Sequence, residues 1–153
     1  MKDNTVYIYG FGNPGRQDDG MGPAIIEKLE SENVPGIITD SNYQMNIEDA
    51  HNISQSDMVV FIDASLDADE PFSFNRIEPS AEITFTTHTM SPESVLALCK
   101  DLYDKDMEAY VMAIKGYEWE FIEGFSERAS YNFNKAYEFL LKKIEELRKK
   151  QQY

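Results

Sequence analysis

Residues 10–22 read GFGNPGRQDDGMG and directly follow the apolar run Val6-Tyr7-Ile8-Tyr9. The run predicts a buried strand. The glycines and Pro14 predict a tight turn after it, because glycine adopts backbone conformations in which other residues clash. Apolar residues at helical spacing over Gly22–Leu29 then predict a helix. This strand–turn–helix beginning is typical of an α/β domain.

Segments with strand and helix patterns alternate along the rest of the chain. Further strands are expected at residues 36–40, 58–63, 72–77 and 109–114, and helices at residues 47–53 and after the capping residues Ser91 and Ser126. The alternation predicts a mostly parallel sheet of about five strands, covered by helices on both faces, with residues 72–77 at its edge. No repeat, linker or composition break divides residues 1–153, so we expect a single domain.

The composition restricts the partners and the compartment. The net charge is −14, which disfavours nucleic acid and anionic membranes and favours a basic protein segment or a metal cation. The more common explanation of an acidic surface is a well-solvated protein without such a role. No apolar run approaches the ~20 residues that span a bilayer. The single cysteine and the absence of a signal pattern predict a cytoplasmic protein.

The glycine segment also matches the dinucleotide-binding pattern G-x-G-x-x-G over residues 10–15, with Asp40 near the place of a ribose-binding carboxylate. We reject a nucleotide site, because a phosphate-binding turn needs a helix that begins within the glycines and offers free amides. Here Pro14 lacks an amide proton and the helical pattern begins later. Asp18 and Asp19 would also face the phosphates, so the segment indicates a cation instead.

Three carboxylates, those of Asp19, Asp40 and Asp63, lie at or just after predicted strand ends, where parallel sheets bind ligands. His88 lies in a loop before the next predicted helix. Two carboxylates and an imidazole suit a first-row divalent ion such as nickel, zinc or manganese, and three protein ligands leave positions open for water or substrate. Each residue also has a structural alternative: Asp63 as a turn former, Asp19 as a helix-start carboxylate, His88 as an ordinary loop residue.

Aromatic residues gather in the segment Tyr117–Phe121 (YEWEF) and at Phe125, before the last predicted helix. Core packing is the ordinary interpretation of such a segment, whereas exposure would mark a partner surface. Cys99 lies on an apolar helix stripe, as buried thiols commonly do. His51 is expected to be solvated and without a role. No Ser–His or Cys–His spacing predicts a covalent nucleophile.

Four blocks of the chain resemble the hydrogenase maturation proteases, which trim a C-terminal peptide from the large subunit of nickel–iron hydrogenase. They are GFGNPGRQDDGMG at 10–22, QMNIEDAHNISQSDMVVFIDAS at 44–65, THTMSPESVLALCKDLY at 87–103 and EFIEGFSERA at 120–129. The resemblance covers nearly the whole chain. It implies a three-layer αβα sandwich around a mixed sheet.

The resemblance also implies site residues. Family members bind metal through two acidic residues and a histidine, and the matching positions are Asp19, Asp63 and His88. Asp18 is a rival to Asp19, because the family often has glutamate at the second position and aspartate is shorter by one methylene. Asp40 matches a further family carboxylate less closely, because the residues after it depart from the glycine-rich family sequence. Nickel is expected to come mainly from the substrate protein, and other divalent ions also fit the site.

The sequence therefore predicts a cytoplasmic endopeptidase that removes the C-terminal extension of a nickel-loaded hydrogenase large-subunit precursor. Its catalytic residues would be Asp19, Asp63 and His88, with Asp40 as a further candidate. A nickel-dependent chaperone that holds the precursor without cutting it would use the same residues. A self-contained metallohydrolase is a third alternative, and it would bind metal tightly without any precursor present.

Overall fold

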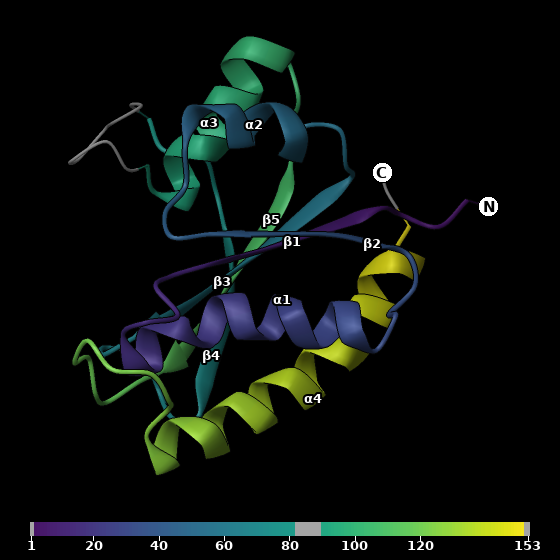
Figure 1. Ribbon diagram of the computed structural model, residues 1–153. Helices are drawn as coiled ribbons and strands as arrows, with labels where there is room; N and C mark the ends of the chain where they lie inside the picture. Colours follow the sequence, from purple (N-terminus) through teal and green to yellow (C-terminus); the bar gives the residue numbers. More distant parts are fainter. Residues whose placement is uncertain (1, 82–89, 152–153) are drawn as a thin grey trace.

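A five-stranded sheet lies between two layers of helices in the computed structural model, which describes residues 2–81 and 90–151 (Figure 1). The strands are β1 (Val6–Phe11), β2 (Ile37–Asn42), β3 (Met58–Ser65), β4 (Phe72–Ile77) and β5 (Glu108–Lys115). The helices are the short 3-10 helix η1 (Gln17–Gly20) and the α-helices α1 (Met21–Ser31), α2 (Ile47–Ile53), α3 (Pro92–Tyr103) and α4 (Glu127–Lys149). The strand order is β2-β1-β3-β5-β4.

The sheet is mixed in the way that the chain predicts. Strands β2, β1, β3 and β5 run parallel, and β4 pairs antiparallel with β5 at the edge. Helices α1 and α4 cover one face, whereas α2 and α3 lie over the other (Figure 1). The expected α/β sandwich around a mixed sheet of five strands is confirmed.

Strands β2 and β3 extend two residues beyond their predicted ends. Pairing with β5 continues as far as Ser65, opposite Lys115, and pairing with β1 carries β2 as far as Asn42. Asp40 and Asp63, predicted at or just after the ends of these strands, therefore lie two residues before the observed ends. Inside a strand, each side chain is committed to one face of the sheet.

Alternate residues of β3 fill the two halves of the core. Val60 and Ile62 pack toward α1 and α4, whereas Val59 and Phe61 pack toward α2 and α3. Asp63 continues the second series, so it lies on the face of α2 and α3. Burial of these apolar side chains is the main stabilising contribution to such a sandwich.

Both predicted caps are present where the chain returns to the carboxyl end of the parallel strands. The Ser91 hydroxyl accepts a hydrogen bond from the Ser94 amide at 3.1 Å and begins α3, and Ser126 caps α4 in the same way. Cys99 is buried, as expected, and burial raises the pKa of its thiol to about 11. Within residues 2–81 and 90–151, no helix is long and apolar enough to cross a membrane.

Candidate functional site

Asp63 is a partly buried carboxylate near the carboxyl end of the central strand β3. Burial, and then the negative charge of Asp19, raise the pKa of Asp63 to about 7. A hydrogen bond from the Ala64 amide acts in the opposite direction and does not offset them. Titratable groups shifted toward neutrality by burial and a like charge are typical of functional sites. Asp63 therefore carries the strongest electrostatic signal at this end of the sheet.

The turn after β1 holds Asp19 next to β3. Asp19 lies on η1, and its Oδ2 atom accepts a hydrogen bond from the Asn13 amide at 2.9 Å. Gly12 has a φ of 141°, and a Cβ at this position would overlap the carbonyl oxygen of Asp19. Glycine is therefore required for the turn to close on Asp19. The structure brings Asp19 and Asp63 together, as the sequence predicts.

The neighbouring Asp18 has a different environment. Its side chain is fully buried and accepts hydrogen bonds from the Tyr117 and Glu118 amides at 2.8 and 3.0 Å, and from the amide and hydroxyl of Ser126 at 2.8 and 2.7 Å. Burial raises the pKa of Asp18, but these hydrogen bonds outweigh burial and hold that pKa below its usual value. Both oxygens of Asp18 are thus used to fix the start of α4 and the loop before it.

Asp40 belongs to a separate cluster, on the opposite side of β1 from Asp63. Its carboxylate accepts hydrogen bonds from the Tyr7 hydroxyl and the Ser41 amide, both at 2.9 Å. Tyr9 donates in the same way to Asp49 of α2 at 2.9 Å. Burial, and then the neighbouring carboxylates, raise the pKa values of both phenols. In the sheet, Asp40 of β2 pairs with Tyr9 of β1, and Tyr9 pairs with Phe61 of β3. Asp63 lies two residues farther along β3.

His88, the predicted third ligand, lies outside the described residues. In the part of the chain that the structure describes, no three His, Cys, Asp or Glu side chains converge as a metal site. His51 is exposed on α2, near Gln55 and the ring of Tyr103, as expected for a solvated residue. The described part of the candidate site is therefore the pair Asp19 and Asp63.

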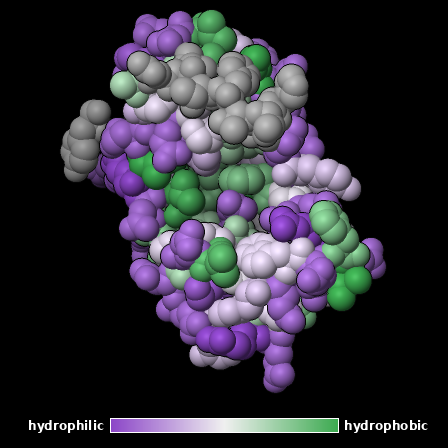
Figure 2. Space-filling view, turned by 90° about the vertical axis from the view of Figure 1, so that its left-hand side faces the viewer, coloured by the Kyte–Doolittle hydropathy of each residue, from purple (hydrophilic) through white to green (hydrophobic). Residues whose placement is uncertain are grey.

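A groove of about 480 Å³ begins at Asp63 and crosses β5 toward the edge strand β4. Its floor contains apolar residues such as Val111 and Ala113, with Ser73 and Asn75 of β4 beside them. Figure 2 shows this end of the molecule hollowed, with hydrophobic residues inside the hollow. Among its described lining residues are two carboxylates, Asp63 and Glu93, and no lysine or arginine. The groove suits an extended chain that is uncharged or basic.

The sequence interpretation did not identify the groove residues of β4. Their signal is an alternation: Ser73, Asn75 and Ile77 occupy every second position of a strand and so share one face. That face could be recognised as a groove only once β4 was paired with β5, which brings Ser73 opposite Ala113. The order of strands, rather than any motif, extends the candidate site beyond Asp63.

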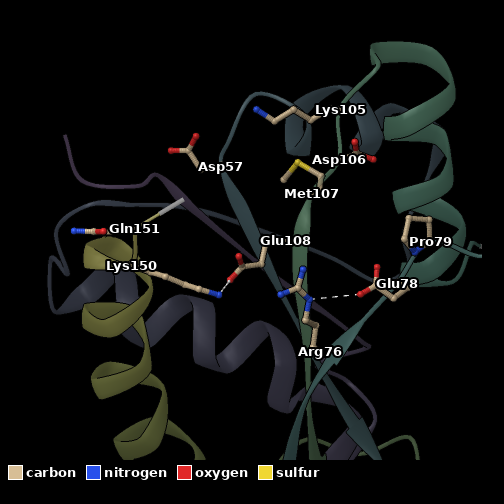
Figure 3. A pocket seen from close by; sticks show the side chains of 10 residues that line it. All are labelled: Asp57, Arg76, Glu78, Pro79, Lys105, Asp106, Met107, Glu108, Lys150 and Gln151. Carbon is tan, nitrogen blue, oxygen red and sulfur yellow. Dashed lines mark hydrogen bonds and ion pairs between the residues drawn. The ribbon is translucent and has the colours of Figure 1, made fainter. Parts of the chain in front are cut away.

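A second hollow, of about 510 Å³, lies at the opposite end of the sheet and contains charges of both signs (Figure 3). Lys150 contacts Glu108 at 2.7 Å and Arg76 contacts Glu78 at 3.5 Å. Burial raises the pKa of Glu108, but hydrogen bonds from Lys150 and Tyr110 outweigh burial and hold that pKa below its usual value. Each of these carboxylates has a basic partner, whereas no ion pair of Asp63 is found among residues 2–81 and 90–151; such pairing is typical of a structural role.

Known proteins share the fold of this chain and part of its sequence. No protein-family model matches the chain. The fold is shared with the [NiFe] hydrogenase maturation protease HycI of Thermococcus kodakarensis (TM-score 0.71, 20% identity, 94% of each chain) and with the hydrogenase maturating endopeptidase HybD of E. coli (TM-score 0.73, 16% identity, 93% of each chain). In sequence, the chain is 28% identical to a Methanocaldococcus jannaschii protein named "Putative hydrogenase maturation protease", over 94% of this chain and 99% of that protein. The chain is similar to hydrogenase maturation proteases over nearly its whole length, as the sequence predicts.

These relatives are named proteases or endopeptidases, in agreement with the predicted enzyme class, a peptidase. The same comparison agrees with the architecture, because the shared fold covers nearly the whole of each chain. In this chain, the strand ends next to the groove combine a partly buried carboxyl, a like-charged neighbour and space for an extended peptide.

Proposed function

We propose that this protein is a hydrogenase maturation protease, an endopeptidase that removes the C-terminal extension of a nickel-loaded [NiFe] hydrogenase large-subunit precursor. The observation that carries the proposal is the placement of Asp63 beside Asp19 at the beginning of the groove, with the pKa of Asp63 raised to about 7. A divalent cation supplied by the substrate would relieve the repulsion between the two carboxylates.

Nickel in the precursor is the substrate group that these residues would recognise. Carboxylate and imidazole ligands suit nickel, and a site with only a few protein ligands leaves positions for the ligands of the precursor. Asp19 and Asp63 are the proposed ligands, together with His88. We give Asp18 no role in ligation, because both its oxygens already accept hydrogen bonds. Nickel bound there would polarise the scissile carbonyl or activate a water molecule.

The groove would hold the C-terminal extension as an extended chain. Its apolar floor would bury aliphatic side chains, and Ser73 and Asn75 offer hydrogen-bonding groups at alternate positions. Asp40 takes a supporting role in this proposal, since it holds β1 through Tyr7 rather than lining the groove. We also propose that the reaction takes place in the cytoplasm, consistent with the single buried free cysteine.

The test is to incubate the protein with a purified precursor that carries its extension, once loaded with nickel and once without it, and to measure the masses of the products. We expect the nickel-loaded precursor to lose one C-terminal peptide and the nickel-free precursor to stay intact. Binding without any mass loss would support the chaperone alternative instead. Cleavage of the nickel-free precursor would contradict recognition through nickel.

Metal titration of the protein alone separates the remaining alternative. A self-contained metallohydrolase would hold a divalent ion tightly without the precursor. We expect weak binding, because a site with few protein ligands lacks the full coordination of a closed metal site. Calorimetric titration with Ni²⁺ or Zn²⁺ measures this directly, and submicromolar affinity would argue for the metallohydrolase.

A further inference from the structure

The loop of residues 117–125 (YEWEFIEGF, the 117–125 loop) carries exposed apolar side chains next to the candidate site. Phe121 is 78% exposed and Ile122 is 59% exposed, whereas Tyr117, Trp119 and Phe125 pack against the core. Part of the aromatic segment thus packs in the core, and part of it is exposed as a partner surface would be. Water contact with a large aromatic ring and a neighbouring isoleucine is unfavourable, so the exposed pair calls for an explanation.

The 117–125 loop is fixed to the segment that carries Asp19. The Gln17 amide donates to the Ile122 carbonyl at 2.9 Å, and the Gln17 side chain accepts from the Glu120 amide at 2.9 Å. Arg16 donates to the Trp119 carbonyl at 2.8 Å, and its guanidinium lies 5.6 Å from the centre of the Phe121 ring. Asp18 anchors both ends of the loop, at Tyr117 and Ser126. Phe121 and Ile122 are therefore held in place before any partner arrives.

Position and charge together indicate the occupant. Gly116, just before the loop, donates to the Ser65 carbonyl at 3.1 Å, so the loop stands beside the end of the strand that carries Asp63. A chain that enters the groove at Asp63 therefore lies at the same end of the sheet as this loop. Three exposed carboxylates, those of Glu118, Glu120 and Glu123, flank the apolar pair. The complementary surface is an apolar hollow with basic residues at its rim.

We propose that Phe121 and Ile122 dock the folded body of the hydrogenase large-subunit precursor, while the groove takes its C-terminal extension. This inference rests on the proposed function. Because the loop is preorganised, docking does not require it to become ordered, and a buried aromatic anchor of this kind commonly contributes much of the binding energy. The flanking glutamates favour a precursor surface that is basic around the contact.

The test compares wild type with the double variant F121S/I122S on the full precursor. We expect KM for cleavage of the nickel-loaded precursor to rise at least tenfold with kcat unchanged, because chemistry at Asp63 is untouched. We expect calorimetric affinity for the nickel-free precursor to fall by a similar factor. The matched control is Leu102→Ser, 58% exposed at the end of α3 on the opposite end of the sheet, which should leave both values unchanged.

A second variant tests the charge argument. Replacing the three flanking glutamates with glutamine (E118Q/E120Q/E123Q) should weaken precursor binding several-fold at low salt. At high salt, the variant and the wild type should bind the precursor equally well. Unchanged KM and affinity in F121S/I122S would overturn the docking proposal, as would a change in kcat alone. A wild-type protein that self-associates through this pair, so that F121S/I122S alone becomes monomeric, would also overturn it. Precursor that is bound but never cut would instead contradict the proposed protease function.

Discussion

The two ends of the sheet both present carboxylates, yet their environments differ. At the amino end, Glu108 accepts hydrogen bonds from Lys150 and Tyr110, and its pKa is lowered. At the carboxyl end, Asp63 is partly buried beside a like charge, and its pKa is raised to about 7. A carboxylate with a cation and a donor stabilises the fold, whereas one placed beside another carboxylate costs stability. The contrast indicates which end the fold keeps for a ligand.

Asp18 shows that this contrast does not depend on location alone. It lies next to Asp19 in sequence and at the same end of the sheet, yet its oxygens accept four hydrogen bonds. Its electrostatic behaviour resembles that of Glu108. The structural carboxylates thus differ from the candidate ligands in the number of hydrogen bonds that their oxygens accept, and not in their position in the sheet.

The largest expected effect is on the rate of precursor cleavage, which should depend on the carboxylate at the carboxyl end of the sheet and not on that at the amino end. Asp63→Asn should reduce the rate of precursor cleavage about a thousandfold, or about 4 kcal/mol in barrier, because a ligand that meets the substrate metal is lost. Glu108→Gln should leave the rate within twofold of wild type. Single-turnover cleavage followed by mass spectrometry measures both. Equal rates for Asp63→Asn and wild type would remove Asp63 from the site.

The second prediction compares the neighbours Asp18 and Asp19 by stability. Asp18→Asn should lower the free energy of unfolding by about 3 kcal/mol, because an amide nitrogen would face buried donors that the carboxylate now satisfies. Asp19→Asn, which keeps an acceptor for the Asn13 amide, should cost less than about 1 kcal/mol. Urea denaturation at pH 7 measures the two values. Similar losses for both variants would contradict the distinction drawn between them.

The third prediction concerns pH. The pKa of Asp63 is about 7 in the folded protein and 3.8 in a model peptide. At a pH between these two values, the carboxyl group is therefore protonated in the folded protein and ionised in the unfolded chain. The contribution of Asp63 to stability should therefore fall as pH rises from about 4 to about 7, by about 4 kcal/mol. Asp63→Asn should remove this dependence and be more stable than wild type at pH 8. Denaturation curves of the two proteins across this range provide the measurement.

The smallest effect belongs to the amino end. Lys150→Ala should cost about 0.5 kcal/mol, because the pair with Glu108 is partly exposed to water. The pH dependence of Glu108 is opposite to that of Asp63. The pKa of Glu108 is lowered in the folded protein, so Glu108 stabilises the fold above its unfolded pKa, and this stabilisation is lost as pH falls. Thermal melts at pH 7 and pH 3 test this. A larger loss at pH 3 than at pH 7 would contradict the assignment.

Much of the fold was predictable because its signals are local. Residues 47–53 and 72–77 form α2 and β4 with the predicted bounds, and Ser91 and Ser126 cap α3 and α4. Hydrophobic periodicity and capping operate within a few residues, so one sequence carries them in full. The ends of β2 and β3 were misjudged, because the last residues of a strand are fixed by partners elsewhere in the chain.

The strand–turn–helix at residues 10–22, the alternation that produces the sandwich, and the candidates Asp19 and Asp63 could all be predicted from the order of residues. Three other features depend on contacts between distant segments: the full engagement of Asp18, the position of Asp40 beside Tyr7, and the groove that leads from Asp63 to β4. Secondary structure follows from short-range sterics and periodicity, whereas the state of a carboxylate depends on donors, charges and burial supplied by distant segments.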